Sequence, residues 1–267
     1  MNILTRYTCF ITIYFFVVHA AFGQKRIQPV SLDTSCLTSG YPAFGIQNLQ
    51  KGHFEYIIRG QEEEMDTDEN KLKLFAIDTV PVADFKRYKA KYTSQLNSDS
   101  GLVSWTDTSL VINHNHYIAD KRDYSEFNYY LGYIEPLQLY CVSYINGKNE
   151  IGLLTLEDQV TGKIFYLESS SDYPLTTPDV SPDITLFSAY VNDLYDYYSF
   201  ISFFKINKSG SKFCLEDYSG LKFPNSRIDD FVWLGSSIFA ILITEINQNN
   251  ETGIQNCLKI TIQVSGR

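Results

Sequence analysis

Short apolar runs bounded by Gly, Asn, Asp, Ser or Pro follow one another along most of the chain. The runs are rich in β-branched and aromatic residues, which pack well on the pleated surface of a sheet. This pattern predicts an all-β protein. Strands are expected at residues 53–59, 71–78, 101–106, 109–113, 127–134, 137–145, 150–157, 163–168, 184–191, 197–206, 211–216, 230–234, 237–245 and 257–264.

One of these segments has apolar side chains at both odd and even positions, between Tyr195 and Phe204. Ile201 and Phe203 fall on one face of the expected strand. Phe200 and Phe204 fall on the other. A central strand covered on both sides is therefore expected here.

Turns and a single helix complete the pattern. Asn146-Gly147 and Gly235-Ser236 each separate two expected strands and favour tight antiparallel hairpins. Residues 82–96 have the spacing of an amphipathic helix. Its apolar positions are Phe85, Tyr88 and Tyr92.

Four aromatic residues lie in or just after strand segments: Trp105, Tyr144, Tyr190 and Trp233, at intervals of 39, 46 and 43 residues. Four short strands with their turns need about 40 to 45 residues, which is the size of one β-propeller blade. The expected fold is therefore propeller-like, with five or six antiparallel four-stranded units in a complete or incomplete ring. A β-sandwich is the alternative, because strands and turns recur roughly every 8 to 12 residues there as well.

The first 23 residues have the layout of a secretory signal peptide. Arg6 supplies the positive end, residues 9–18 the apolar region and residues 21–23 a small-x-small cleavage site. The apolar stretch is shorter than the roughly 20 residues that span a bilayer, so an uncleaved anchor is the less favoured alternative. We expect residues 24–267 to form a single secreted all-β domain with no membrane span.

The chain is acidic, with 22 basic and 31 acidic residues and a formal charge of −9. Nucleic acid and anionic membranes attract clustered Lys and Arg. The one dense cationic stretch is interpreted as the solvated face of a helical or extended connector; it contains Lys86, Arg87, Lys89 and Lys91. A nucleic-acid partner is therefore disfavoured, and an extracellular protein or glycan is the expected partner.

Four cysteines follow the signal segment: Cys36, Cys141, Cys214 and Cys257. An even number in a secreted chain favours two disulfides, with three alternative connectivities. A bridge between Cys36 and Cys257 would join the two ends of the chain. The wide separation of the cysteines argues against a zinc site built from paired CxxC motifs.

Two Asn-x-Ser/Thr tripeptides, at Asn207 and Asn250, fall in polar turns between apolar runs. N-glycans attach to such tripeptides in secreted proteins. We expect at least one of the two to be glycosylated, in agreement with an extracellular location.

No catalytic, cofactor or metal site stands out. Residues 66–70 begin like a calcium loop, but Lys71 replaces the required glycine and Ile77 the bidentate Glu. His114 and His116 could share a metal on a strand, but exposed turn histidines are the expected state. No serine lies in a Gly-x-Ser-x-Gly elbow. We therefore expect no catalytic residues, cofactor or metal.

A secreted glycosidase would need two carboxylates about 5 to 10 Å apart. Five aspartates lie near repeat boundaries, where they could face an axial pocket or simply serve as turn residues. They are Asp107, Asp183, Asp193, Asp229 and Asp230. The tyrosines of residues 129–133 and 190–198 could form a sugar-stacking or protein-binding face, or pack in the core.

These observations lead to three hypotheses. The leading one is a secreted extracellular binding or interaction protein without a catalytic site, so the chain is more plausibly not an enzyme. The alternative is a secreted propeller-type hydrolase that acts on a glycan through inward-facing carboxylates. The third is a subunit or truncated copy of a larger propeller protein.

Overall fold

The structure is a computed structural model of the chain, and it describes residues 31–32, 57–59, 75–98, 103–106, 108–113, 115–118, 127–146, 151–168, 173–246 and 252–262. These residues are mostly in β-strands, with one short α-helix, α2 (Val82–Lys89), and one 3₁₀ turn, η4 (Glu135–Leu137). No helix in these ranges is long and apolar enough to cross a membrane. The predicted signal peptide, residues 1–23, lies outside the described residues.

Four antiparallel meanders follow one another in chain order. The first sheet contains β5 (Val103–Trp105), β6 (Ser109–Ile112) and β7 (Asn115–Ile118). The second contains β8 (Phe127–Ile134), β9 (Leu139–Asn146), β10 (Ile151–Asp158) and β11 (Ile164–Glu168). The third contains β12 (Thr176–Val180), β13 (Leu186–Asp193), β14 (Tyr198–Ser209) and β15 (Lys212–Pro224). The fourth contains β16 (Ser226–Trp233), β17 (Ile238–Ile246) and β18 (Thr252–Ile262).

Earlier strands join the edges of three of these sheets. β3 (Phe75–Val80) pairs antiparallel with β18 and so extends the fourth sheet. β4 (Leu96–Asn97) pairs with β8 at one edge of the second sheet. β1 (Ser31–Leu32) and β2 (Ile57–Arg59) pair in parallel with β15 and β11.

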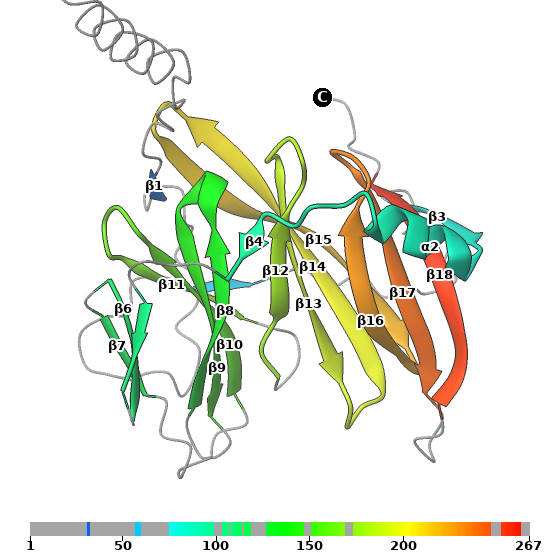
Figure 1. Cartoon of the computed structure of the whole chain (residues 1–267), viewed down its shortest axis with the longest axis horizontal. Helices are drawn as coiled ribbons and strands as arrows, with labels where there is room; N and C mark the ends of the chain where they lie inside the picture. The colour runs from blue at the N-terminus through cyan, green and yellow to red at the C-terminus, as the bar shows by residue number, and fades with distance from the viewer. Residues whose placement is uncertain are drawn as a thin grey trace, which may run out of the picture.

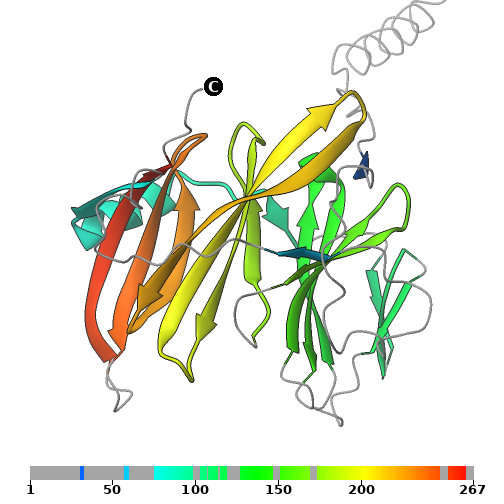
Figure 2. The same ribbon diagram turned by 180° about the vertical axis from the view of Figure 1, so that it is seen from behind.

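The four sheets lie side by side in chain order, with β5–β7 at one side of the molecule and β16–β18 at the other (Figures 1 and 2). A separate apolar cluster fills the space between each pair of neighbours. The outer face of the fourth sheet is covered by α2, through Phe85 packed on Val232 and Ala240. Burial of apolar surface between successive layers therefore holds the stack together.

The third sheet shows why its strands are apolar on both faces. In β14, Phe200 and Phe204 belong to the cluster shared with the second sheet. Ile201 and Phe203 belong to the cluster shared with the fourth. Since side chains alternate across a strand, a sheet packed between two layers needs apolar residues at every position. The predicted central, doubly covered strand is confirmed.

The strand predictions hold well. Every predicted segment overlaps a strand of the structure, and strands flank both predicted hairpin turns as antiparallel pairs. The short strands β1, β4, β7 and β12 were not predicted. The predicted helix over residues 82–96 forms only as Val82–Lys89. Beyond it, the Ser94 hydroxyl and the Gln95 backbone N–H donate to Asp179.

The predicted propeller is not found. The described sheets stack in a row, and no closed or propeller arrangement is detected among them. A two-layer sandwich does not describe them either, because three successive interfaces are filled. Trp105, Tyr144, Tyr190 and Trp233 do mark four successive sheets. They are not equivalent, since Trp105 is 54% exposed while Tyr190 and Trp233 share one core cluster.

Candidate functional site

A cavity of about 620 Å³ lies at the C-terminal end of α2, between this helix, the fourth sheet and the turn after β12. Its wall is formed by Tyr88, Lys91, Tyr92, Thr93, Gln95, Pro182, Trp233, Leu234, Ile238 and Lys259. We call it the α2 pocket. Its size lies within the range of about 300 to 1,000 Å³ found for small-molecule sites.

The position of α2 is set by one buried ring and by charges at its ends. Phe85 is 3% exposed and packs against the fourth sheet. Asp84 lies in the first turn, and three basic residues lie in the last turn, as the helix dipole favours. The Lys89 ammonium donates to the Asp230 carboxylate of β16 at 2.5 and 2.7 Å. The end of the helix is thereby fastened beside the β16–β17 hairpin.

Asp179 of β12 holds the segment that follows the helix. Its carboxylate accepts hydrogen bonds from the Tyr92 hydroxyl, from the Ser94 hydroxyl at 2.8 Å and from the Gln95 backbone N–H at 3.0 Å. A bulge between Thr176 and Asp179 interrupts the pairing just before this residue, and bulges re-aim side chains in this way. Asp179 therefore positions the Tyr92–Gln95 wall of the pocket.

Burial determines the protonation behaviour of this pair. It raises the pKa of Tyr92, and the neighbouring Asp179 carboxyl raises it further. Burial also raises the pKa of Asp179, although the hydrogen bonds from Tyr92 and Ser94 oppose that effect. Tyr92 therefore stays protonated at neutral pH, and its hydroxyl proton is committed to Asp179.

Trp233 forms the inner wall of the pocket. Its ring is 2% exposed and lies 5.4 to 6.1 Å from the rings of Phe231, Phe239 and Phe203, at steep angles. The indole nitrogen has no hydrogen-bond partner within the described part of the chain. A rigid aromatic cluster thus supports the pocket from behind.

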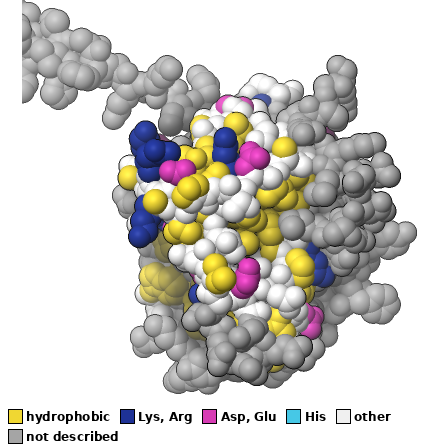
Figure 3. Space-filling model, turned by 90° about the vertical axis from the view of Figure 1, so that its right-hand side faces the viewer, with side chains coloured by type: hydrophobic (Ala, Val, Ile, Leu, Met, Phe, Trp, Pro, Cys, Tyr) yellow, Lys and Arg dark blue, Asp and Glu magenta, His cyan; other side chains and the backbone are white. Residues whose placement is uncertain are grey.

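Two lysines supply the charge of the pocket. Neither Lys91 nor Lys259 forms an ion pair with another described residue. The described lining residues include no Asp, Glu, His or Cys. Figure 3 shows the side of the molecule on which α2 and the fourth sheet lie, and basic side chains gather along one edge of it next to apolar ones. The pocket is therefore cationic and aromatic.

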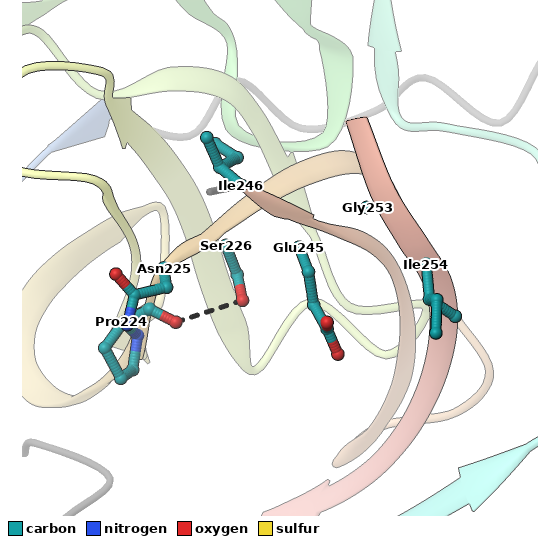
Figure 4. A pocket seen from close by; sticks show the side chains of 7 residues that line it. All are labelled: Pro224, Asn225, Ser226, Glu245, Ile246, Gly253 and Ile254. Atoms are coloured by element: carbon teal, nitrogen blue, oxygen red, sulfur yellow. Dashed lines mark hydrogen bonds between the residues drawn. The ribbon is translucent and has the colours of Figure 1, made fainter. Parts of the chain in front are cut away.

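A second hollow of about 410 Å³ lies where the β15–β16 turn approaches the ends of β17 and β18, and its lining is drawn in Figure 4. The Ser226 hydroxyl donates to the Pro224 carbonyl at 3.1 Å. The Glu245 carboxylate accepts from the Asn256 amide at 3.2 Å. Because these polar groups are engaged with neighbours and Glu245 is the only carboxylate in the described lining, this hollow is less suited to a ligand.

The structure corrects the disulfide prediction. Cys141 and Cys257 are free, buried thiols, so the predicted bridge between Cys36 and Cys257 is wrong. Cys141 packs between the second and third sheets and Cys257 packs beneath α2, where each serves as a small apolar side chain. Cys214 is disulfide-bonded. Cys36 lies outside the described residues.

The other predicted positions are distributed around the fold. Asn207 lies within β14, opposite Cys214 of β15, and is half-buried. Asn250 and His114 lie outside the described residues, and His116 is exposed on β7. No group of three or more metal-ligating side chains occurs in the described ranges. Glycosylation of Asn207 and Asn250 stays a prediction.

Four of the five candidate aspartates lie in the described residues, and each accepts hydrogen bonds from neighbouring protein groups. Asp183 and Asp193 accept hydrogen bonds inside the turns after β12 and β13. Asp229 accepts from Arg227 of its own strand and from side chains of β17 and β18, and Asp230 accepts from Lys89 of α2. The pKa of Asp183 and Asp229 is lowered, because hydrogen bonds outweigh the opposing effect of partial burial. Asp107 lies outside the described residues.

Most of the α2 pocket was not predicted. Lys91 was part of the cationic stretch and Trp233 part of the aromatic spacing, but nothing in the sequence linked them. Asp179 and Lys259 carried no signal, because only the tertiary structure brings Lys259 to the pocket and Asp179 to its wall residue Tyr92. No family model, curated protein or solved structure matches the chain.

Proposed function

We propose that the chain is a secreted extracellular binding protein that holds part of its ligand in the α2 pocket. The lining of this pocket carries the proposal. It combines aromatic and apolar side chains with a few polar ones, as small-molecule sites do. Two of the polar groups are lysines, and no carboxylate is among the described lining residues.

Features of the sequence support an extracellular location. Residues 1–23 have the layout of a signal peptide, and Asn207 and Asn250 lie in glycosylation tripeptides. The disulfide bond of Cys214 agrees with an oxidising compartment. An extracellular protein or glycan is therefore the partner class that we propose. The proposal requires the pocket and not a closed ring of blades.

A secreted glycan hydrolase is the second candidate, and one side chain favours it. Burial raises the pKa of Glu157 to about 7, which is the behaviour of a glycosidase general acid. However, Glu157 is 0% exposed between the first and second sheets. A glycosidic bond could not reach it there, so binding is the better supported function.

The test uses the full chain, expressed with its own residues 1–23 in a eukaryotic secretory line. Recovery from the medium with Gln24 as the first residue would support secretion. The protein is then screened on an array of extracellular glycans and on purified extracellular proteins. Thr93→Trp enlarges an exposed lining residue of the α2 pocket, whereas Thr79→Trp changes an exposed residue of β3 that does not line it.

A partner bound by the wild type and by Thr79→Trp, but lost with Thr93→Trp, would support the proposal. If every partner binds Thr93→Trp as well as the wild type, the α2 pocket is not the binding site. Shortened glycans released from the array, identified by mass spectrometry, would favour the hydrolase instead.

A further inference from the structure

We propose that the α2 pocket binds a small organic anion, in which a carboxylate is attached to a ring of monosaccharide size. Lys91 and Lys259 hold the carboxylate, and the aromatic wall holds the ring. This inference rests on the proposed function, because it names the ligand class of the same pocket.

The charges around α2 leave one cation of the helix region free at the pocket. Arg87 is paired with Asp84 at 3.1 Å, and Lys89 is paired with Asp230. Lys91, which lines the pocket, has no ion pair within the described residues. In a chain of formal charge −9, such a cation beside a cavity is a natural site for an anion.

Lys259 reaches the same cavity from β18. Asp78 of β3 lies directly opposite it in the sheet, so the two side chains share a face. They form no ion pair in the described part of the chain. We therefore expect Lys259 to contribute less to anion binding than Lys91, because Asp78 offsets part of its charge.

The Asp179 carboxylate, which accepts from the wall residue Tyr92, is not itself among the lining residues. Asp179 is 4% exposed, and the Tyr92 hydroxyl donates to it. Its oxygens accept from the hydroxyls of Tyr92 and Ser94 and from the backbone N–H of Gln95 and Val180. These bonds spread the charge of Asp179 over the surrounding donors.

The remaining wall suits a ring. Tyr88, Tyr92, Leu234 and Ile238 offer apolar surface, while Thr93 and Gln95 offer hydrogen-bonding groups. Aromatic side chains stack on the C–H faces of sugars and on other rings. A volume of about 620 Å³ accommodates one or two such rings.

The inference can be tested with tryptophan fluorescence. The chain has two tryptophans, so Trp105→Phe leaves Trp233, in the pocket wall, as the only reporter. Two probe pairs are titrated: glucuronate with glucuronamide, and phenylacetate with phenylacetamide. The members of a pair differ in charge and share a ring, and the two pairs separate acidic sugars from aromatic acids.

One anion of the two pairs should bind at least about tenfold more tightly than its amide, since a charged hydrogen bond is the difference between them. Raising the NaCl concentration from 0.05 to 0.5 M should lower the affinity for the anion and leave the affinity for the amide unchanged. Lys91→Gln should lower the affinity for the anion about three- to tenfold, and Lys259→Gln should lower it by less. Lys86→Gln, which removes a cation of α2 outside the pocket, is the matched control. Thermal unfolding of each variant confirms that it folds.

Three results would overturn the inference. Equal binding of acid and amide, unaffected by Lys91→Gln, would mean a pocket for neutral rings, and the proposed function would survive. Equal weakening by Lys86→Gln and Lys91→Gln would assign binding to diffuse surface charge. If none of the four probes binds at 50 mM, the anion site is rejected. The Thr93→Trp comparison then decides the proposed function separately.

Discussion

Glu157 is a carboxyl enclosed between the first and second sheets. It is 0% exposed, and the Tyr117 hydroxyl of β7 donates to its Oε2 at 2.6 Å. Burial raises the pKa of Glu157 from 4.5 to about 7, although the hydrogen bond from Tyr117 opposes this shift. The folded protein therefore keeps a proton on Glu157 at pH values where the unfolded chain has lost it.

Protonation of Glu157 should make stability depend on pH. Its contribution is fully present below pH 4.5, the unfolded pKa, and is lost as the pH rises through about 7. The loss amounts to at most about 3 kcal/mol in the free energy of unfolding. Glu157→Gln has no such proton and should lack this decrease. Urea unfolding at a series of pH values from 4 to 8 measures the difference.

The control for this experiment is Glu245→Gln, which changes an exposed glutamate of β17. It should keep the decrease seen in the wild type. A Glu157→Gln protein with an unchanged pH dependence would show that other groups cause it.

At the scale of elements, the pairing of β1 with β15 bears on the disulfide. In their parallel register, Leu32 lies opposite Phe213, next to Cys214. Cys36 follows Leu32 by four residues, a length of chain that can span up to about 13 Å. This reach is ample for the short Cα separation of a disulfide. We therefore expect the bridge of Cys214 to be formed with Cys36.

Non-reducing peptide mapping should find one bridged pair, Cys36 with Cys214. Cys141 and Cys257 should react with iodoacetamide only in denaturant. Both are 0% exposed, and burial raises the pKa of both thiols, which makes the reactive thiolate scarce. In Cys36→Ser, Cys214 should become reactive under native conditions. A bridged peptide containing Cys257 would contradict this assignment.

The same scale shows what strand prediction could achieve. β14 could be found because apolar residues fill both of its faces. β12 was not predicted, because Thr177 and Pro178 interrupt the alternation of apolar and polar residues. Thr177 also adopts a positive φ of 49°. Because this irregular strand was not predicted, the role of its Asp179 in holding the wall of the α2 pocket was not predicted either.

At the scale of the whole molecule, the third sheet supplies residues to both of the large core clusters. Phe200 packs towards the second sheet and Phe203 towards the fourth. Loss of this sheet would therefore expose both interfaces at once. We expect the second, third and fourth sheets to unfold together.

The expected cooperativity can be measured in the Trp105→Phe protein. Trp233 fluorescence reports the interface between the third and fourth sheets, whereas far-ultraviolet circular dichroism reports all strands. The two urea transitions should coincide. Phe200→Leu, on the opposite face of the third sheet, should shift both midpoints equally, because core truncation costs on the order of 1 to 3 kcal/mol. Separate transitions would mean that the sheets unfold independently.

The longer strands and their hairpin pairing could be predicted from the sequence alone. Apolar alternation, β-branched and aromatic runs and turn residues such as Gly235-Ser236 act over a few neighbouring residues, so they can be read without the fold. The apolar residues on both faces of β14 also predicted that other layers cover both faces of this strand.

Only the tertiary structure decided how those sheets are arranged and where a site forms. A spacing of about 43 residues fits any succession of four-stranded sheets, so it could not distinguish a closed ring from the open stack that is observed. Likewise, Lys91 and Lys259 lie far apart in the chain but line the same pocket, and Asp179 of β12 accepts from the wall residue Tyr92. Local patterns fix local structure, whereas contacts between distant segments depend on how whole faces pack.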